Sequence, residues 1–283
     1  MNITSGALLT DLYELTMAQA YLAQGMTDIA VFEFFVRKLP PQRNFFMAAG
    51  LEQVLSYLEA FQFSDADIAW LDQTGGFRPA SLNALRAMRF TGEVHAMPEG
   101  SLFFPHEPIL RITAPLPQAQ LVETRVMNLL NFQTMVASKA CRSVLVAGDK
   151  PLIDFGLRRA HGAEAGLLAA RAAYLAGLAG TSNVSAGARF GIPIYGTMAH
   201  SFVQAHLDEA EAFTHIAEAQ PRNVVLLIDT YDTEAAAEKV VSLAGRLNAR
   251  GISIHGVRLD SGDLADHARK VRHILDRGGL TAT

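Results

Sequence analysis

Polar side chains able to do chemistry follow directly after four short apolar runs in the second half of the chain. They occupy Asp154–His161, Gly196–Ser201, Asp229–Thr233 and Arg258–Asp263, which together hold three arginines, two histidines and five aspartates. Arginine forks bind phosphate or carboxylate groups, and carboxylates bind hydroxyls or Mg²⁺. These four segments therefore predict a site for an anionic substrate that is rich in hydroxyl groups.

The elements that must position these segments alternate regularly after about residue 150. Each apolar run has the length of a strand, and a stretch with helical periodicity follows it. The predicted strands are Leu152–Phe155, Ile192–Tyr195, Val224–Ile228 and Ile252–Leu259, and the predicted helices begin near Ala163 and Phe202 and cover Ala235–Leu247 and Leu264–Asp276. This alternation predicts a parallel sheet, whose ligands bind at the carboxyl ends of the strands.

Two ambiguities remain at the level of pattern. Four strand–helix units are half of an eight-stranded barrel, but an open doubly wound sheet has the same periodicity. A polar residue after a strand is also often only a helix cap. We expect Asp263 and Thr233 to be caps, whereas Asp260, which follows Arg258 at the end of an apolar run, is expected to bind a ligand.

The first 140 residues have a mixed rhythm that says little about function. The patterns predict a strand, two helices, short strands broken by prolines and one long helix, in the order Ala30–Arg37, Ala48–Phe61, Asp65–Gln73, Gly92–Arg111 and Gln118–Arg142. We therefore predict an α/β N-terminal domain over residues 1–140 and a second α/β domain over residues 141–283.

Composition excludes several classes of protein. The chain has 283 residues, a net charge of −4 and a sequence pI of about 6.1, so it lacks the basic excess of a nucleic-acid-binding surface. Its single cysteine, Cys141, predicts a buried inert thiol. The apolar stretch at residues 163–180 contains Glu164 and Arg171, which argues against a membrane span. Since no signal-peptide pattern opens the chain, we expect a cytoplasmic protein that binds neither nucleic acid nor membrane.

Familiar motifs of other enzyme classes are missing from the sequence. It contains no GxxxxGK[ST] phosphate loop, no GxGxxG after a strand, no cysteine and histidine pair at zinc spacing and no GxSxG elbow. Residue types and spacing alone therefore predict an α/β enzyme for a phosphate-bearing substrate, without naming its reaction.

Six segments resemble the nicotinate phosphoribosyltransferase family, and they occur in the family's order over nearly the whole chain. They are Leu9–Met17, Asp154–Arg158, Gly180–Val184, Gly196–Ser201, Asp229–Thr233 and Arg258–Asp263. The resemblance implies an α/β N-terminal domain followed by an irregular TIM-like α/β barrel, and a homodimer with shared active sites. It also implies transfer of phosphoribosyl from phosphoribosyl pyrophosphate to nicotinate in NAD biosynthesis, with Mg²⁺ required and ATP hydrolysed through a phosphohistidine in a ligase-type coupling.

The resemblance also implies roles for individual residues. His200 matches the histidine that ATP phosphorylates, and with Arg258 and Asp260 it forms the predicted catalytic set, in which Asp260 is also the candidate contact to Mg²⁺. Phe155 and Tyr13 match the aromatic pair that sandwiches the pyridine ring, with Tyr13 expected from the partner subunit. The remaining expected substrate contacts are Arg158, Ser182, Thr197, Ser201 and Asp229.

The choice of base is predicted from Ser182. The related nicotinamide enzymes carry an aspartate at this position, where it accepts a hydrogen bond from the amide of nicotinamide. Because nicotinate presents a carboxylate instead, an aspartate would repel it, whereas a serine can donate a hydrogen bond to it. The sequence therefore favours nicotinate over nicotinamide, and the more distant quinolinate phosphoribosyltransferases match the loops less well.

The match stops before the family's pattern is complete. Family members continue with further strands and a Gly-rich loop for the ribose 5′-phosphate, whereas this sequence stops at Thr283, so we expect a barrel that is truncated before closure. A non-catalytic remnant that only binds ligand is the alternative from another class. An aldolase-like phosphate-binding barrel is disfavoured, because none of the lysines after residue 38, namely Lys139, Lys150, Lys239 and Lys270, ends an apolar strand.

Overall fold

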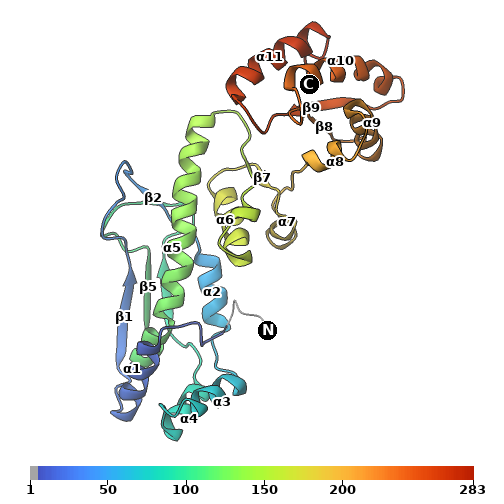
Figure 1. Cartoon of the computed structure of the whole chain (residues 1–283). Coiled ribbons are helices and arrows are strands. Elements are labelled where there is room, and N and C mark those ends of the chain that lie inside the picture. The colour runs from blue at the N-terminus through green and yellow to red at the C-terminus, as the bar shows by residue number, and fades with distance from the viewer. Residues whose placement is uncertain (1–5) are drawn as a thin grey trace. The chain divides into compact units, whose positions relative to one another are not determined.

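A computed structural model describes residues 6–283, and these residues divide into two compact units (Figure 1). The first unit runs to Tyr195 and the second is Gly196–Thr283. Both are built from helices and short strands, which confirms the predicted α/β class. The predicted domain boundary between residues 140 and 141 falls inside the first unit and stays a prediction.

The first unit is organised around one long helix, α5. In chain order its elements are α1 (Leu12–Ala23), β1 (Ile29–Phe34), β2 (Phe46–Met47), α2 (Leu51–Glu59), α3 (Asp65–Gln73), α4 (Pro79–Ala87), β3 (Glu93–Ala96), β4 (Leu102–Phe103), β5 (Leu110–Pro115), α5 (Leu116–Ala147), β6 (Ile153–Asp154), η1 (Leu157–Arg159), α6 (Ala163–Leu175), β7 (Gly180–Thr181) and α7 (Val184–Phe190). Pro117 lies in the first turn of α5, where its missing N–H breaks no helical hydrogen bond.

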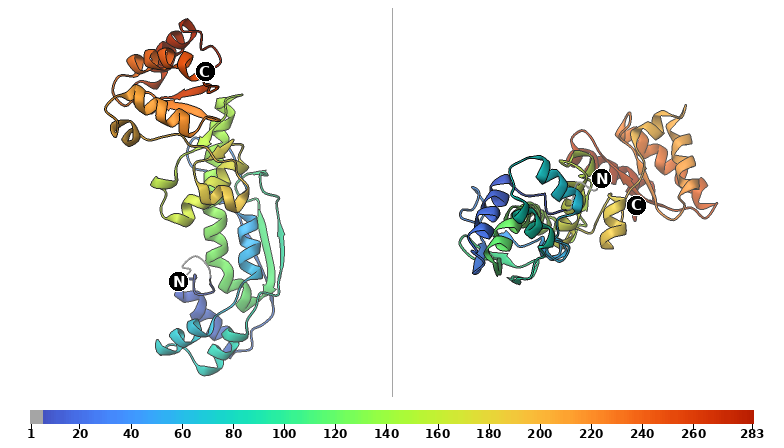
Figure 2. Two further views of the ribbon diagram at one scale, coloured as in Figure 1. Left: turned by 90° about the vertical axis from the view of Figure 1, so that its right-hand side faces the viewer. Right: turned by 90° about the horizontal axis from the view of Figure 1, so that it is seen from below.

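A three-stranded antiparallel sheet in the order β1–β5–β3 packs against α5, and Figures 1 and 2 show β1 and β5 alongside that helix. Every second residue of the central strand β5 is buried, so Leu110, Ile112 and Ala114 face the core. Leu121 and Val126 supply part of the matching apolar face of α5. Cys141, near the end of α5, is a buried free thiol, as predicted.

Two parallel strand contacts follow α5, and one of them differs from the prediction. The strand β6 pairs with β7 at Gly180–Thr181, whereas the predicted strand Ile192–Tyr195 is reduced to an isolated bridge between Ile194 and Thr181. Pro193 has no N–H to donate, so the contact consists of two hydrogen bonds. The Pro193 carbonyl accepts the Thr181 N–H, and the Tyr195 N–H donates to the Thr181 carbonyl. A Cβ on Gly180 would lie 2.3 Å from the Pro193 carbonyl oxygen, which explains why a glycine stands in this strand.

A nearly buried ion pair fastens α6 to the start of α2. Arg171 of α6 donates two hydrogen bonds to Glu99, at 2.9 and 2.7 Å, and also pairs with Glu52. Glu99 in turn accepts the N–H groups of Gly50 and Leu51 at 2.6 and 3.1 Å. Burial alone would raise the pKa of Glu99, but its bonds to Arg171 and to these N–H groups lower it below the ordinary value.

We expect Glu99→Gln to lower the free energy of unfolding by about 2–4 kcal/mol, because it leaves the Arg171 guanidinium facing an amide in a nearly buried place. Glu52→Gln is the matched control, since 60% of the Glu52 side chain is exposed and its pairing should contribute less than about 1 kcal/mol. Urea unfolding at pH 7 measures both. Because the folded-state pKa of Glu99 is lowered, its contribution is present at neutral pH and is lost as the pH falls through that pKa. Equal losses in the two variants would contradict this account.

The second unit contains α8 (His200–Gln204), α9 (Glu209–Ala219), β8 (Val224–Leu227), α10 (Thr233–Asn248), β9 (Ile254–Arg258) and α11 (Leu264–Arg277). Its two strands are parallel, and Figure 1 shows α10 and α11 side by side next to them. Leu226, Leu227 and Ile228 are fully buried in succession, as expected where both faces of a parallel strand are covered.

The two predicted helix caps of this unit have different outcomes. The Asp263 carboxylate accepts the N–H of Asp266 at 3.0 Å at the start of α11, which confirms that prediction. The predicted cap at Thr233 is wrong, because Asp232 caps α10 by accepting the N–H of Ala235 at 2.8 Å. Thr233 is instead a buried first residue of the helix. None of the helices formed by residues 6–283 has the length and apolar character needed to span a bilayer.

Candidate active site

The strand ends of the first unit bring Phe155 and Ser182 to neighbouring positions. The parallel pairing sets Asp154 opposite Thr181, so the next residue on each strand leaves the sheet beside the other. The Ser182 N–H donates to the Asp154 carbonyl at 2.8 Å and fixes this register. Phe155 is 46% exposed and Ser182 is half-buried, so both side chains lie at the rim of the strand ends.

Asp154 holds these strand ends in place, a role that the sequence did not reveal. One of its carboxylate oxygens accepts the Thr181 hydroxyl at 2.8 Å, and the other accepts the Gly156 N–H at 2.9 Å. The buried Thr181 hydroxyl also accepts the N–H of Asn183, whose own side chain caps α7. The partner of Asp154 is Thr181, 27 residues later, so no local pattern in the sequence indicates this role.

The other predicted residues of the first unit lie elsewhere on it. Arg158 is exposed on the short helix η1, three residues after Phe155. Tyr13 is on α1, where its hydroxyl lies 3.5 Å from both Glu14 and Glu123. Tyr13 lies on α1, which packs against α5, whereas Phe155 follows β6, the partner of β7, and the α1 and β7 labels stand apart in Figure 1.

In the second unit, Arg258 joins two of the predicted segments. It is the last residue of β9, opposite Leu227 of β8. Its guanidinium donates to Asp260 at 2.7 Å and to both the Thr197 hydroxyl and the Met198 carbonyl at 3.2 Å. The planar fork of arginine suits this bridging of two loops, which a lysine cannot reproduce.

His200 is the first residue of α8 and lies between Thr230, which follows β8, and Asp260, which follows β9. Its Nδ1 is 3.2 Å from the Thr230 hydroxyl, and its Nε2 is 3.7 Å from the Asp260 carboxylate. The His200 and Asp260 side chains are 38% and 46% exposed, so a ligand in solvent can reach both. Asp260 therefore contacts the arginine and lies close to the imidazole, an arrangement suited to holding or transferring a negatively charged group. Ser201 is exposed in the same turn of α8.

Asp229 holds the loop that carries Asp260. It is only 9% exposed, and its Oδ2 accepts the Asp260 N–H at 2.9 Å and the Ser261 hydroxyl at 2.6 Å. Its Oδ1 is buried without a hydrogen-bond partner among residues 6–283. Asp229 therefore fixes this loop with one carboxylate oxygen, and its other oxygen can accept a further hydrogen bond.

The described residues contain no group of three or more histidine, cysteine or acidic side chains that could hold a metal ion. Mg²⁺ needs fewer protein ligands, because it keeps several waters and is usually bound by one or two carboxylates together with substrate phosphates. Asp260 and the unpartnered oxygen of Asp229 fit such an ion. These residues therefore suit magnesium that is carried by a phosphorylated substrate.

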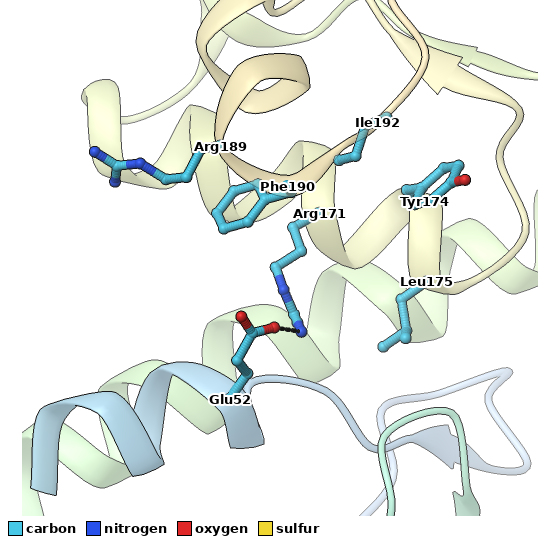
Figure 3. Close-up of a pocket in the computed structure, with 7 residues that line it drawn as sticks. All are labelled: Glu52, Arg171, Tyr174, Leu175, Arg189, Phe190 and Ile192. Atoms are coloured by element: carbon cyan, nitrogen blue, oxygen red, sulfur yellow. Dashed lines mark hydrogen bonds and ion pairs between the residues drawn. The ribbon is translucent and has the colours of Figure 1, made fainter. Parts of the chain in front are cut away.

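A separate pocket of about 290 Å³ lies between α2, α6 and α7 and is shown in Figure 3. Glu52, Arg171 and Arg189 line it together with Tyr174, Leu175, Phe190 and Ile192, and none of these is a predicted site residue. In Figure 3 Arg171 turns to Glu52, while the Arg189 side chain extends away from them. Since Glu52 and Glu99 already neutralise Arg171, the pocket lacks the concentrated positive charge that a diphosphate requires.

Comparison with known sequences covers both halves of the chain. Residues 8–131 match the family model of the nicotinate phosphoribosyltransferase (NAPRTase) N-terminal domain, and residues 151–277 match that of the NAPRTase family. A nicotinate phosphoribosyltransferase of Mycobacterium tuberculosis is 51% identical over 275 residues, which are 97% of this chain and 59% of that protein. The Bacillus subtilis nicotinate phosphoribosyltransferase is 44% identical, over 97% of this chain and 56% of its own length.

Solved structures agree with these matches. Human nicotinic acid phosphoribosyltransferase superposes with a TM-score of 0.87 at 34% identity, over 96% of this chain and 66% of the human one. A nicotinate-nucleotide pyrophosphorylase from Pyrococcus furiosus gives a TM-score of 0.77 at 25% identity, over 97% and 63%. The chain thus spans about 60% of the length of the proteins that it resembles. With both family models matched in order, the chain belongs to the nicotinate phosphoribosyltransferase family.

Proposed function

We propose that this chain catalyses the transfer of phosphoribosyl from phosphoribosyl pyrophosphate to the ring nitrogen of nicotinate. The products are nicotinate mononucleotide and pyrophosphate, in the biosynthesis or salvage of NAD. The observation that carries the proposal is the set of Thr197, Arg258 and Asp260, which hydrogen bonds join in the second unit, with the His200 imidazole 3.7 Å from the Asp260 carboxylate. The chain that contains this set belongs to the family, and the family resemblance assigns these four residues to the site.

Four residues that the family motifs single out contact the base and its carboxylate in this proposal. Phe155 stacks on the pyridine ring, and Tyr13 of the partner subunit covers the opposite face in a homodimer. Each aromatic contact contributes about 0.5–1.5 kcal/mol beyond its buried area. Ser182 donates to the nicotinate carboxylate, and the exposed Arg158 provides a positive charge for an anionic group of the substrates.

Charged residues that the family motifs single out contact ribose and phosphate. The ribose carbon loses pyrophosphate early, so the transition state resembles an oxocarbenium ion and no protein nucleophile attacks the sugar. Catalysis then depends on positioning and on the placement of charge. Arg258 binds phosphate oxygens, and Asp260 and Asp229 hold ribose hydroxyls and Mg²⁺. When bound, the magnesium ion neutralises charge on the leaving pyrophosphate.

His200 accepts a phosphoryl group from ATP in the same proposal. Because Thr230 and Asp260 flank its two ring nitrogens, the imidazole is held in one orientation while it stays accessible. Mass spectrometry at alkaline pH after incubation with ATP and Mg²⁺ tests this role. A phosphoryl adduct that persists in His200→Asn would show that His200 is not the acceptor. The barrel architecture and a cytoplasmic location belong to the same family-based proposal.

The proposal is tested by the product. The purified chain is incubated with phosphoribosyl pyrophosphate, Mg²⁺, ATP and one of nicotinate, nicotinamide or quinolinate. Formation of nicotinate mononucleotide from nicotinate, measured by mass, is the expected result. If every mixture lacks a mononucleotide while the folded chain still binds nicotinate, the chain only binds ligand and the proposal fails. Product from nicotinamide or quinolinate alone would reassign the substrate.

A further inference from the structure

Glu14 is a fully buried carboxyl in the first turn of α1, where that helix packs against α5. Its Oε1 lies 3.0 Å from the backbone nitrogen of Thr124 and 3.0 Å from the Thr124 hydroxyl. Its Oε2 is buried and has no hydrogen-bond partner within residues 6–283. A charged carboxylate in such a place is costly, so the protonation state of Glu14 is a structural question.

Counting hydrogens at Thr124 decides which state fits. The Thr124 hydroxyl lies 2.9 Å from Oδ2 of Asp11 as well as 3.0 Å from Oε1 of Glu14. A hydroxyl has one hydrogen, so it can donate to only one of two ionised carboxylates. If Glu14 carries a proton, it donates to the Thr124 oxygen while Thr124 donates to Asp11, and both contacts become hydrogen bonds. One proton on either carboxyl satisfies both distances, and Glu14 is the one that should carry it, because Glu14 is buried whereas the exposed Asp11 can be stabilised as an anion by water.

The surrounding groups favour the same state. Glu123 of α5 and Asp11 of α1 both add negative charge near Glu14, and Glu123 also lies 3.5 Å from the Tyr13 hydroxyl. Tyr57 of α2 faces Glu14 with a buried hydroxyl that lacks a partner among the described residues. Arg125, the nearby cation on α5, is held by Glu164 and Asn128, and the backbone N–H of Arg78, before α4, donates to Gln19 of α1. Burial raises the pKa of Glu14 most, the two hydrogen bonds from Thr124 oppose it, and the neighbouring carboxylates add to it, so that the pKa lies at about 7.

We propose that Glu14 is a positioning residue, a neutral carboxyl that fastens the first turn of α1 to Thr124 and thereby fixes the neighbouring Tyr13 ring for stacking on nicotinate. The part concerning nicotinate rests on the proposed function. Loss of the proton places a third negative charge beside Asp11 and Glu123 and leaves Thr124 with one hydrogen for two acceptors. The first turn of α1 then loosens, and Tyr13 with it.

The direction of the pH dependence follows from the raised pKa. The unfolded chain holds this proton only below the ordinary carboxyl range, whereas the folded chain holds it up to about pH 7. The stabilisation is therefore fully present below the ordinary pKa and is lost as the pH rises toward 7. Glu14→Gln keeps the size and a donor to Thr124 but cannot ionise, so it should abolish this part of the pH dependence.

Thermal unfolding of the wild type, Glu14→Gln and the exposed control Glu59→Gln, at pH 5 and pH 8, tests the proposal. Glu14→Gln should match the wild type at pH 5 and exceed its Tm by about 3–6 °C at pH 8, while Glu59→Gln follows the wild type at both. Amide exchange in residues 9–16 should speed up between the two pH values beyond its intrinsic increase in the wild type and in Glu59→Gln, but not in Glu14→Gln. An equal Tm shift of Glu14→Gln at both pH values would overturn the proposal, because a lost contact alone acts at every pH.

Kinetics separates this inference from the proposed function. If only the protonated form binds nicotinate, the KM for nicotinate rises by up to about 20-fold between pH 6.5 and pH 8.5, and Glu14→Gln removes that rise. A rise of the same size in Glu14→Gln would overturn the link to Tyr13. A chain without any turnover counts against the proposed function alone, since the Tm and exchange results still decide the role of Glu14.

Discussion

Ser182→Asp is expected to lower kcat/KM for nicotinate by about a thousandfold. The nicotinate carboxylate and the new aspartate would be two negative charges about 4 Å apart, which repel by about 4 kcal/mol at an effective dielectric constant near 20. Each 1.4 kcal/mol corresponds to a tenfold change in affinity, which gives about three decades. The Ser182 N–H is tied to the Asp154 carbonyl, so the backbone at this position cannot easily retreat.

Ser182→Asn is the matched control, because asparagine has the size of aspartate without its charge. We expect it to lose far less nicotinate activity than Ser182→Asp, since its amide can still donate to the carboxylate. Steady-state rates with nicotinate and nicotinamide measure both variants. Full nicotinate activity in Ser182→Asp would contradict the proposed place of Ser182 at the carboxylate, and equal losses in both variants would point to size and not charge.

Arg258→Lys should lower kcat/KM by at least about a hundredfold. The arginine joins Asp260 on one side to Thr197 and the Met198 carbonyl on the other, so it holds two loops of the second unit in register. A lysine keeps the charge but reaches only one of these loops, and the geometry for phosphate binding is lost. Initial rates with saturating nicotinate and varied phosphoribosyl pyrophosphate measure the effect.

Arg250→Lys serves as the control for Arg258, since Arg250 is an exposed arginine of the same unit that pairs with Glu218. A surface pair of this kind contributes at most about 1 kcal/mol to stability, and its substitution should leave the rate unchanged. If Arg258→Lys behaves like Arg250→Lys, the arginine is a surface group with no part in the reaction.

Strong periodic signals made most of the fold predictable. The helix at residues 264–277 was predicted to within one residue at its C-terminal end, and Asp65–Gln73 was predicted at both ends. Both segments combine an acidic or hydroxyl cap with helix-forming residues, so local and global preferences agree. Within each unit, polar segments at the ends of paired parallel strands were likewise predictable, since parallel strands place their carboxyl ends at one edge. The single four-stranded sheet that the sequence predicted is instead two separate two-stranded sheets.

Features that depend on contacts distant in sequence were not predictable. The strand β7 contains Gly180, which has a low strand propensity, and a side chain there would collide with the Pro193 carbonyl and the Tyr195 ring. Asp154 positions the strand ends through Thr181, 27 residues later, and Glu14 meets Thr124 110 residues later. Such pairings leave no local pattern, so neither role is visible before the chain is folded.

Hydrogen exchange with and without phosphoribosyl pyrophosphate, Mg²⁺ and nicotinate tests the central claim most directly, namely that the strand-end segments bind the substrates. Ligands should slow amide exchange in residues 154–159, 180–183, 197–201, 229–233 and 258–263 and leave the pocket residues at 171–175 and 189–192 unchanged. Protection confined to the pocket between α2, α6 and α7, with none at the strand ends, would contradict the account.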